Sequence, residues 1–479
     1  MSSQYRLFVR HAHQVVQVVK NGERCLKGEA MKNVAVINAE NGVGISLVVD
    51  KQGRLVAVDR DYVIEARFRD AVFEKIIDAT GCCVLPGLVD SHTHPVWAGD
   101  RVHEFAMKLA GATYLEIHAA GGGIHFTVDK TRAASDQELL ESLLKRLENM
   151  LRSGTTLVEA KSGYGLDTGT ELRLLKVLEA AKGKAALEIS STYCGAHAVP
   201  KGKTVQEATE NIIDEQIPEI QRLIAEGVLS VENIDVFCEK GVFDVESSQR
   251  ILQAGKDISL RVNFHGEELS NIGGAEMGAK IGATAISHLE CVSKTGIQAM
   301  SKSGTTAVIL PTTAFILRLE PPPVRDMIKA NVPVALGSDF NPNAHCFSMP
   351  MVMHMACVIC HMSLPEALVA STINGAAALG RAETHGSLEV GKMADLLVLE
   401  APSWEHLIYP MVMHMACVIC HMSLPEALVA ATINGAAALG RAETHGSLEV
   451  GKMADLLVLE APSWEHLIYQ FGSHDRLIK

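Results

Sequence analysis

The pattern of apolar and polar residues divides the chain into two kinds of sequence. Between residues 31 and 80, short apolar runs such as VAVINA, ISLVVD and LVAVD alternate with polar turns. Runs of this length, bounded by turn residues, are typical of β-strands joined by short connections. This part of the chain is therefore predicted to be built from strands and turns.

A different pattern begins near residue 81 and continues to about residue 340. Short apolar runs alternate with longer amphipathic stretches, as in TTLVEAKSGYG followed by ELRLLKVLEAAK. Alternating strand and helix signals predict a parallel α/β fold. The segment from His92 to Asp339 spans 248 residues, close to the roughly 250 residues of an eight-stranded β/α barrel. We therefore expect a (β/α)8 barrel of the TIM type, in which polar residues at the carboxyl ends of the strands line the active site.

The last part of the chain contains an internal repeat. Pro350–Tyr409 recurs as Pro410–Tyr469, and the two 60-residue copies differ only at Ser371 and Ala431. Old structural repeats diverge to weak similarity, so this near-identity indicates a recent event, either a duplicated exon or an error in assembling the gene. Without one copy the chain has 419 residues, and the fold is predicted from that length.

These patterns predict a barrel with a small β-sandwich domain that is built from both termini. In chain order we expect the N-terminal part of the small domain, the barrel, the C-terminal strands of the small domain, a displaced second copy and a truncated tail: residues 1–80, 81–383, 384–409, 410–469 and 470–479. The first copy should hold the native position, because its link to the last barrel strand is short and costs the least entropy to close. The second copy would then expose its apolar helix face.

The composition excludes several classes of protein. Hydrophobic residues make up 48% and charged residues 21%, which excludes disorder for most of the chain. With 43 Lys and Arg against 56 Asp and Glu, the net charge is −13, so nucleic acid and anionic membranes are poor partners. No apolar stretch approaches the ~20 residues of a membrane span, and the first residues lack the apolar core of a signal peptide. The expected compartment is the cytosol, where cysteines stay reduced.

Residues that can bind a metal close several of the predicted strands. His92 and His94 follow the apolar run CVLPGLVD directly, so both imidazoles can face the same side. His265, His288 and Asp339 close three further runs. Each alone has an ordinary explanation, a hydrogen-bonded histidine or a helix cap, but together they suit zinc or iron. An ion held by them would acidify a bound water and favour hydrolysis of a C–N or C–O bond.

Several motifs resemble the amidohydrolase superfamily: PGLVDSHTH, a later HG, SHLE, GSDFNP and TINGAAALG…GSLEVGKMADLLVLE. Within that superfamily, further motifs are similar to the imidazolonepropionase family: AGDRVHEFAMKLAGATY, AGGGI, KSGYGLD, TYCGAHAVPKGK and GSDFNPNA. The similarity covers nearly the whole chain apart from the extra copy. It is specific, because several of these motifs lie outside the metal ligands that the superfamily shares.

The resemblance implies a reaction and a set of site residues. The family uses water to open the ring of 4-imidazolone-5-propanoate, a small anionic substrate, and gives N-formimidoyl-L-glutamate in L-histidine degradation. The implied ligands of one zinc or iron ion are His92, His94, His265 and Asp339. The implied substrate contacts are Arg101, Tyr164, His197, Glu268 and Asn341, with Tyr114 as a weaker candidate. A single ion is expected, because no lysine stands where a bridging carbamate would need one. A homodimer is also implied.

The residue types suit these roles. Arg101 can bind the propionate tail of the substrate through two hydrogen bonds. Glu268 can hold a ring nitrogen or move a proton, and His288 can orient the attacking water or stabilise the oxyanion. Glu268, His288 and Asp339 all stay candidates for the base that takes the proton of the water. Asn341 is followed by a proline, so a turn is an alternative explanation for it.

Two other functions stay open from the sequence. A different amidohydrolase, such as a cyclic-amide hydrolase or a nucleobase deaminase, would share the metal ligands but not the motifs around Arg101, Tyr164 and His197. A non-catalytic scaffold that has kept the fold would be expected to have lost ligands, and every candidate is present. A non-catalytic product of an aberrant gene is a further alternative. The extra copy bears on stability more than on chemistry. So does the end of the chain at Lys479, where the family usually continues with another strand.

Overall fold

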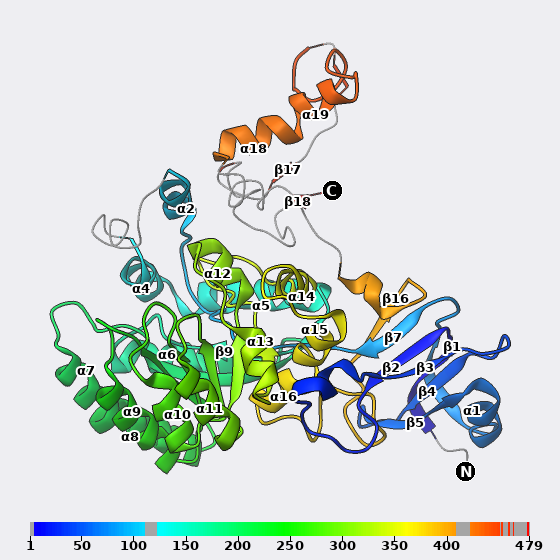
Figure 1. Cartoon of the computed structure of the whole chain (residues 1–479), viewed down its shortest axis with the longest axis horizontal. Helices are drawn as coiled ribbons and strands as arrows, with labels where there is room; N and C mark the ends of the chain where they lie inside the picture. Colours follow the sequence, from blue (N-terminus) through cyan, green and yellow to red (C-terminus); the bar gives the residue numbers. More distant parts are fainter. Residues whose placement is uncertain are drawn as a thin grey trace.

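The fold is described from a computed structural model of the chain (Figure 1). The described residues are 4–110, 122–408 and 422–450, with short pieces at 452–453, 458–459, 463 and 477–478. Within these ranges no helix is both long enough and apolar enough to cross a membrane.

Eight parallel strands form the sheet of the larger body. Their order is β15-β14-β13-β12-β11-β10-β9-β8, and every neighbouring pair is parallel. The strands are β8 (Leu88–Asp90), β9 (Thr155–Lys161), β10 (Glu188–Ala196), β11 (Asn233–Cys238), β12 (Arg261–Gly266), β13 (Ala285–His288), β14 (Thr306–Ile309) and β15 (Val334–Leu336). The barrel predicted from the alternating pattern is confirmed.

The sheet closes between its first and last strands through the residues that follow them. The backbone N–H of His94 donates to the carbonyl of Phe340 at 2.8 Å, and the N–H of Asp339 donates to the carbonyl of His92 at 2.9 Å. These hydrogen bonds continue the ladder past the ends of β8 and β15. The closing segments therefore bring His92, His94 and Asp339 to the same end of the barrel.

Helices pack on the outside of the sheet, between successive strands. Helix α5 (Asp136–Arg152) shows the reason: Ser135 caps its N-terminus, and Leu139, Leu143 and Leu147 form one buried stripe at helical spacing. The other helices of the barrel are α2 (Val102–Leu109), α4 (Ile124–Ala133), α6 (Thr168–Lys182), α7 (Val205–Asn211), η2 (Ile212–Gln216), α8 (Ile217–Ala225), α9 (Val245–Asp257), α10 (Gly274–Ile281), α11 (Lys294–Ser303), α12 (Pro311–Leu317), α13 (Val324–Lys329), α14 (Met349–Val358), α15 (Leu364–Ala370) and α16 (Ile373–Ala378).

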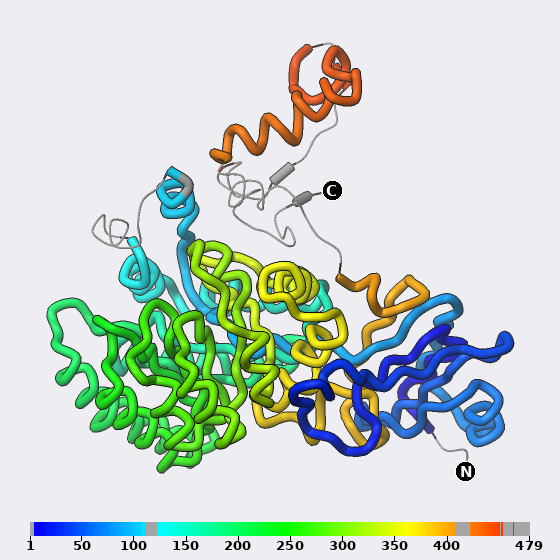
Figure 2. The backbone as a smooth tube through the Cα atoms, viewed as in Figure 1, coloured from blue at the N-terminus to red at the C-terminus, as the bar shows by residue number. Residues whose placement is uncertain are grey.

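Two four-stranded sheets form the smaller body, in the orders β5-β4-β1-β6 and β16-β7-β2-β3. Its elements are β1 (Gln4–Ala12), β2 (Gln14–Val18), β3 (Ala35–Asn38), β4 (Ile45–Val49), β5 (Leu55–Arg60), α1 (Asp61–Arg67), β6 (Val72–Asp78), β7 (Cys83–Pro86), β16 (Leu396–Leu399) and η3 (Trp404–Leu407). The short helix η1 (Gly28–Lys32) packs instead against α13 and α15 of the barrel. Apolar residues of both sheets, including Val9, Leu47 and Val84, share one buried core. Strand β16 pairs antiparallel with β7, so segments from both ends of the chain build this body (Figure 2). The predicted small β-sandwich from both termini is confirmed.

The two copies of the repeat have different environments. The first copy provides most of α14, together with α15, α16 and β16, and its Leu379 and Leu388 are 0% and 1% exposed. The corresponding residues of the second copy, Leu439 and Leu448, are 78% and 80% exposed. Identical sequences are therefore buried in one copy and exposed to solvent in the other.

The described helices of the second copy lie apart from the barrel wall (Figure 1). They are α18 (Leu424–Ala431) and α19 (Ile433–Ala438). Only α18 has buried residues: Leu424 and Ala427 share an apolar cluster with Phe105 of α2, Phe315 of α12 and Met355 of α14. This contact covers a small part of the apolar surface that the copy exposes.

Deleting either copy of the repeat should leave the same folded body. Removal of residues 410–469 or of residues 350–409 yields two 419-residue chains that differ only in a serine or an alanine at position 371. The Ser371 hydroxyl is buried without a hydrogen-bond partner among the described residues, so alanine should not destabilise the fold. We expect the two chains to unfold within about 4 °C of each other in calorimetry.

Both short chains should also aggregate less than the 479-residue chain in light scattering, because the exposed apolar surface is gone. A short chain that is unfolded, or that aggregates more than the full-length chain, would contradict this account of the repeat.

Candidate metal centre and active site

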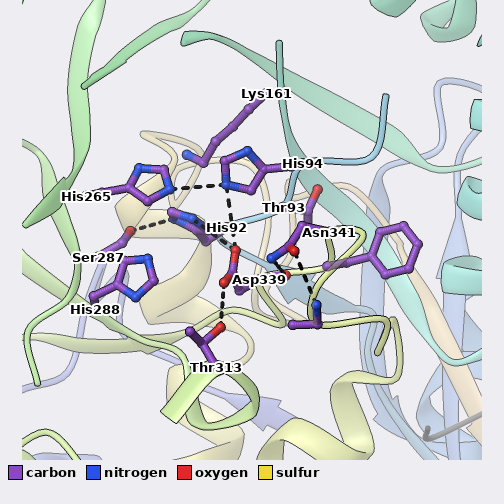
Figure 3. Close-up of polar contacts among 12 residues, drawn as sticks. His92, Thr93, His94, Lys161, His265, Ser287, His288, Thr313, Asp339 and Asn341 are labelled. Atoms are coloured by element: carbon purple, nitrogen blue, oxygen red, sulfur yellow. Dashed lines mark hydrogen bonds and ion pairs between the residues drawn. The ribbon is translucent and has the colours of Figure 1, made fainter. Parts of the chain in front are cut away.

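Four side chains from three strands converge at the carboxyl end of the barrel (Figure 3). His92 and His94 follow β8, His265 lies in β12 and Asp339 follows β15. The Nε2 atoms of His94 and His265 are 3.1 Å apart, and Asp339 Oδ1 lies 3.5 Å from His92 Nε2 and 3.6 Å from His94 Nε2. Potential ligand atoms of His92, His94 and Asp339 lie within 4.8 Å of one another. Such spacing allows the group to hold one metal ion.

Hydrogen bonds at the rear of these side chains orient them. His92 Nδ1 is 2.7 Å from the Ser287 hydroxyl, and His265 Nδ1 is 2.8 Å from Asp235 Oδ1. The Thr313 hydroxyl donates to Asp339 Oδ2. Partners of this kind fix the orientation of metal-binding groups and leave the opposite atom free.

A buried nitrogen atom of His92 indicates that these residues fit a metal ion. His92 Nε2 is completely buried, and in the described part of the chain it has no hydrogen-bond partner. An unpaired buried nitrogen is costly unless a ligand satisfies it. Because it faces Asp339 Oδ1, the arrangement fits an ion between the imidazoles and the carboxylate.

Burial sets the charge state of the imidazoles. Desolvation, reinforced by neighbouring cationic groups, lowers the pKa of His92, His94 and His288 well below the ordinary value. Burial also lowers the pKa of His197 to about 3. The histidines are therefore neutral near pH 7, which is the form in which an imidazole nitrogen can bind a metal.

The backbone is strained at two residues of this site. His288 has a φ of 79° and Asp339 has a φ of 48°. A non-glycine residue in the left-handed region costs about 1 kcal/mol or more. Strain of this kind clusters at functional sites, where the surrounding fold holds a side chain in a required direction.

A pocket above the cluster collects most of the residues expected from the sequence. Its cavity volume is about 70 Å³. Its lining includes His94, Arg101, Tyr164, His197, His265, Glu268, His288, Asp339 and Asn341. Tyr114 lies outside the described residues.

Arg101 presents a buried cation to this pocket. It is 5% exposed, its Nε donates to the Thr127 hydroxyl at 3.0 Å, and the same nitrogen lies 3.7 Å from Glu104 Oε1. Its Nη2 atom is buried and has no hydrogen-bond partner among the residues that the structure describes. The guanidinium therefore keeps a donor for an anionic group of a ligand.

His197 and Asn341 differ in how free their polar atoms are. His197 Nδ1 is 2.9 Å from the carbonyl of Gly163, and the ring stacks on His94 with 4.6 Å between centroids. Asn341 Nδ2 donates to the carbonyl of Asp339 at 2.6 Å, and its Oδ1 accepts the N–H of Asn343 at 2.7 Å. Asn341 thus stabilises the turn and also lines the pocket, and its contact with substrate stays a prediction.

Glu268 and His288 lie beside each other at the edge of the cluster. Glu268 Oε2 is 3.8 Å from His288 Nε2. Burial, together with the nearby carboxyl groups of Glu290 and Asp339, raises the pKa of Glu268 well above the ordinary value. A carboxyl group in this state can carry a proton near neutral pH.

Comparison with known proteins places this architecture in a family. The model of the amidohydrolase family matches residues 83–420 and 405–474. The chain belongs to the amidohydrolase family. Two matching ranges that overlap are expected of an amidohydrolase chain that carries its last segment twice.

Curated amidohydrolase relatives are similar over most of their length. A protein of Nematostella vectensis named "Probable imidazolonepropionase" is 61% identical over 403 residues, which cover 84% of this chain and 94% of that protein. A protein of Homo sapiens with the same name is 58% identical over 409 residues, covering 85% and 95%.

Solved structures share the fold at low sequence identity. An adenosine deaminase from Xanthomonas campestris with bound zinc has a TM-score of 0.60 at 17% identity, covering 88% of this chain and 90% of that chain. A triazine hydrolase variant has a TM-score of 0.63 at 15% identity, covering 85% and 91%. These likenesses support the barrel with its small β domain.

Sequence reasoning missed several residues of this amidohydrolase site. Asp235, Ser287 and Thr313 contact the expected ligands directly, and Glu290 Oε2 lies 3.8 Å from His288 Nδ1. Ser287 and Glu290 lie within the SHLE motif, so that motif could have pointed to them. Asp235 and Thr313 have no local signal, because their partners are distant in the sequence.

Proposed function

We propose that this amidohydrolase is an imidazolonepropionase, which hydrolyses 4-imidazolone-5-propanoate to N-formimidoyl-L-glutamate in L-histidine degradation. One observation carries the proposal: curated relatives named probable imidazolonepropionase are 54–61% identical to the chain. The alignments cover 93–96% of the relatives' lengths. Similarity of this extent supports a shared reaction as well as a shared fold. The family expected from the sequence motifs is confirmed.

The donor set supports one zinc or iron ion. Three imidazoles and one carboxylate suit either metal, and we assign them to His92, His94, His265 and Asp339. Such an ion supplies a water of lowered pKa. The remaining chemistry is assigned to side chains of the chain.

The reaction moves protons in a defined way. A water oxygen bonds to the ring carbonyl carbon, and the bond from that carbon to the adjacent ring nitrogen breaks. One proton of the water ends on that nitrogen, and the other is released as the new carboxyl group ionises. The site therefore needs a base near the water, an acid near the nitrogen and a donor for the carbonyl oxygen.

We assign these three roles to Asp339, Glu268 and His288. Asp339 has one oxygen facing the imidazoles while Thr313 holds the other, so it takes the proton of the water. Glu268, with its raised pKa, gives a proton to the leaving nitrogen. His288 stands next to Glu268 and donates to the carbonyl oxygen as negative charge develops on it.

The other pocket residues bind the substrate. Arg101 pairs with the propionate tail, because its Nη2 is available in the pocket. Tyr164, His197 and Asn341 contact the ring or the tail, and Tyr114 stays a predicted contact. The homodimer, the cytosolic location and the absence of nucleic-acid and membrane partners also stay predictions from the sequence.

Freshly generated 4-imidazolone-5-propanoate should be hydrolysed by the purified 479-residue chain and by the chain lacking residues 410–469. Dialysis against a chelator should remove the activity, and one equivalent of zinc or iron should restore it, because the donor set fits one ion. Product is followed by loss of ring absorbance and by mass spectrometry, with a neutral cyclic amide and adenine as control substrates. Activity on a control, without activity on the imidazolone, would sink the proposal.

Replacing Arg101 with methionine should weaken capture of the substrate without loss of metal. A hydrogen bond to a charged group contributes about 1.5–3 kcal/mol, so kcat/KM should fall about 10- to 100-fold, mainly through KM. Arg152, which lies 73% exposed on α5, offers the matched control: Arg152→Met should leave both constants unchanged. Equal loss of bound metal in Arg101→Met would argue against a role in substrate binding.

A further inference from the structure

A lysine lies in the barrel interior beside the metal-binding side chains (Figure 3). Lys161 is the last residue of β9 and is 1% exposed. A buried ammonium group is costly unless it is paired. Its Nζ lies 2.6 Å from Glu159 Oε2 and 2.7 Å from Asp235 Oδ2, and both carboxylates are 0% exposed. The proposed reaction uses none of these three side chains.

Asp235 connects this lysine to a metal ligand. While Oδ2 binds Lys161, Oδ1 lies 2.8 Å from His265 Nδ1 and also accepts the backbone N–H of His265 at 3.1 Å. Because a carboxylate can only accept, His265 Nδ1 donates to Asp235. The other ring nitrogen of His265, Nε2, lies 3.1 Å from His94 Nε2, where the metal would bind.

Glu159 binds the same lysine but not the assigned metal ligands. Its Oε1 accepts the hydroxyl of Thr192 at 2.6 Å. Within the described residues its carboxylate forms no hydrogen bond or ion pair with His265. The chain thus offers two buried carboxylates on one lysine, of which only Asp235 reaches the metal site.

We propose that Lys161 is a positioning residue, which holds Asp235 so that His265 presents Nε2 to the metal. Lys161 has no direct contact with the reacting atoms. The inference deepens the proposed function, since it concerns the metal site of that reaction. Its physical basis is that Asp235 pairs with a fixed cation on one side and therefore cannot rotate away from the imidazole on the other.

The test measures metal binding without substrate, so a wrong substrate assignment would not affect the result. Metal-free full-length chain and variants are titrated with zinc in competition with a chromophoric chelator, and the Co²⁺ absorption spectrum reports the ligand geometry. Lys161→Met and Asp235→Asn should each weaken zinc binding about 10- to 100-fold, the range known for the partners of metal ligands. The Co²⁺ spectrum should change in both.

Lys161 acts on the metal site through Asp235, so the variant with both substitutions should bind zinc no more weakly than Asp235→Asn alone. Glu159→Gln is the matched control. It should keep zinc affinity within about twofold, because Glu159 pairs with Lys161 but does not bind His265. If Lys161→Met does not fold, the double variant Lys161→Met/Glu159→Gln removes the excess buried negative charge and should show the same loss of affinity. Native affinity and spectrum in either Lys161 variant would overturn the proposal. So would a loss in Glu159→Gln as large as that in Lys161→Met, which would indicate a general structural role.

The repeat supports a second, independent inference. Strand β17 (Val458–Leu459) pairs antiparallel with β18 (Leu477–Ile478). Val458 and Leu459 are the second copies of Val398 and Leu399, which lie in β16 at the edge of the small-domain sheet. The same short sequence therefore occurs as a strand against β7 and as a strand against β18.

Either copy contains the residues needed for the edge strand of the small-domain sheet. Suppose that 60 consecutive residues, starting anywhere between residues 350 and 410, are left out of the fold. The residues that remain then follow one another in the same sequence, apart from the serine or alanine. With the first copy in place, residues 410–469 form a C-terminal appendage and close no internal loop. Use of any part of the second copy closes an internal loop of 60 residues, and the entropy cost of that loop varies little with its position. When the second copy supplies the edge strand, β18 can add to the sheet beside it and cover an exposed edge.

We infer that the strand of the second copy exchanges with β16 at the edge of the small-domain sheet. Leu399 packs partly buried on the main core, so Leu399→Asp should disrupt the first copy only. The 419-residue chain has no second copy to replace the strand. The drop in melting temperature that Leu399→Asp causes in this chain is therefore the full effect of disrupting the strand. In the full-length chain it should cause less than half of that drop, and Leu459→Asp should cause almost none.

The full-length double variant should show the whole drop, because neither copy can then supply the strand. Melting is followed by calorimetry and by near-ultraviolet circular dichroism. If Leu399→Asp destabilises the full-length chain as much as the 419-residue chain, the strands do not exchange and the inference is wrong.

Discussion

Closure of the barrel between β8 and β15 is the constraint on which the proposed metal site depends. Three of the four assigned ligands lie in the two segments that make this closure, and the hydrogen bonds between the segments use the backbone of the ligands themselves. Gly337 permits the close approach, because a Cβ atom there would lie 2.8 Å from the Cβ of His92. A larger residue would separate the segments and with them the ligands.

The same closure explains why water has little access to the site and why forming the site costs free energy. Neutral imidazoles, a carboxylate and two strained residues are gathered where water has little access. Hydrogen bonds with Ser287, Asp235 and Thr313 satisfy one polar atom each of His92, His265 and Asp339. An ion bound between the side chains would satisfy further atoms, and its binding would then be coupled to the stability of this end of the barrel.

The repeat shows that the surrounding tertiary structure decides whether a given segment is buried or exposed. Leu379 and Leu439 have nearly identical neighbours in the chain, yet one is buried and the other is mostly exposed. The barrel offers one position for the segment, and the copy that follows the last strand by a short link occupies it. The second copy keeps its local helices, because capping and helix propensity are properties of the segment itself.

From the amino-acid sequence alone one can predict the alternation of strands and helices, the two-part architecture and the residues that close the barrel strands. These features are local, because periodicity, caps and strand ends are written within a few residues of one another. The family motifs also placed Arg101, Tyr164 and His197 in advance, and the structure brings them to one pocket. Only the tertiary structure disclosed that Lys161, Asp235 and His265 form a chain of contacts. They lie on β9, β11 and β12, more than 100 residues apart from first to last, and resemble ordinary strand residues. The register of neighbouring parallel strands, which no local pattern encodes, decides that their side chains meet.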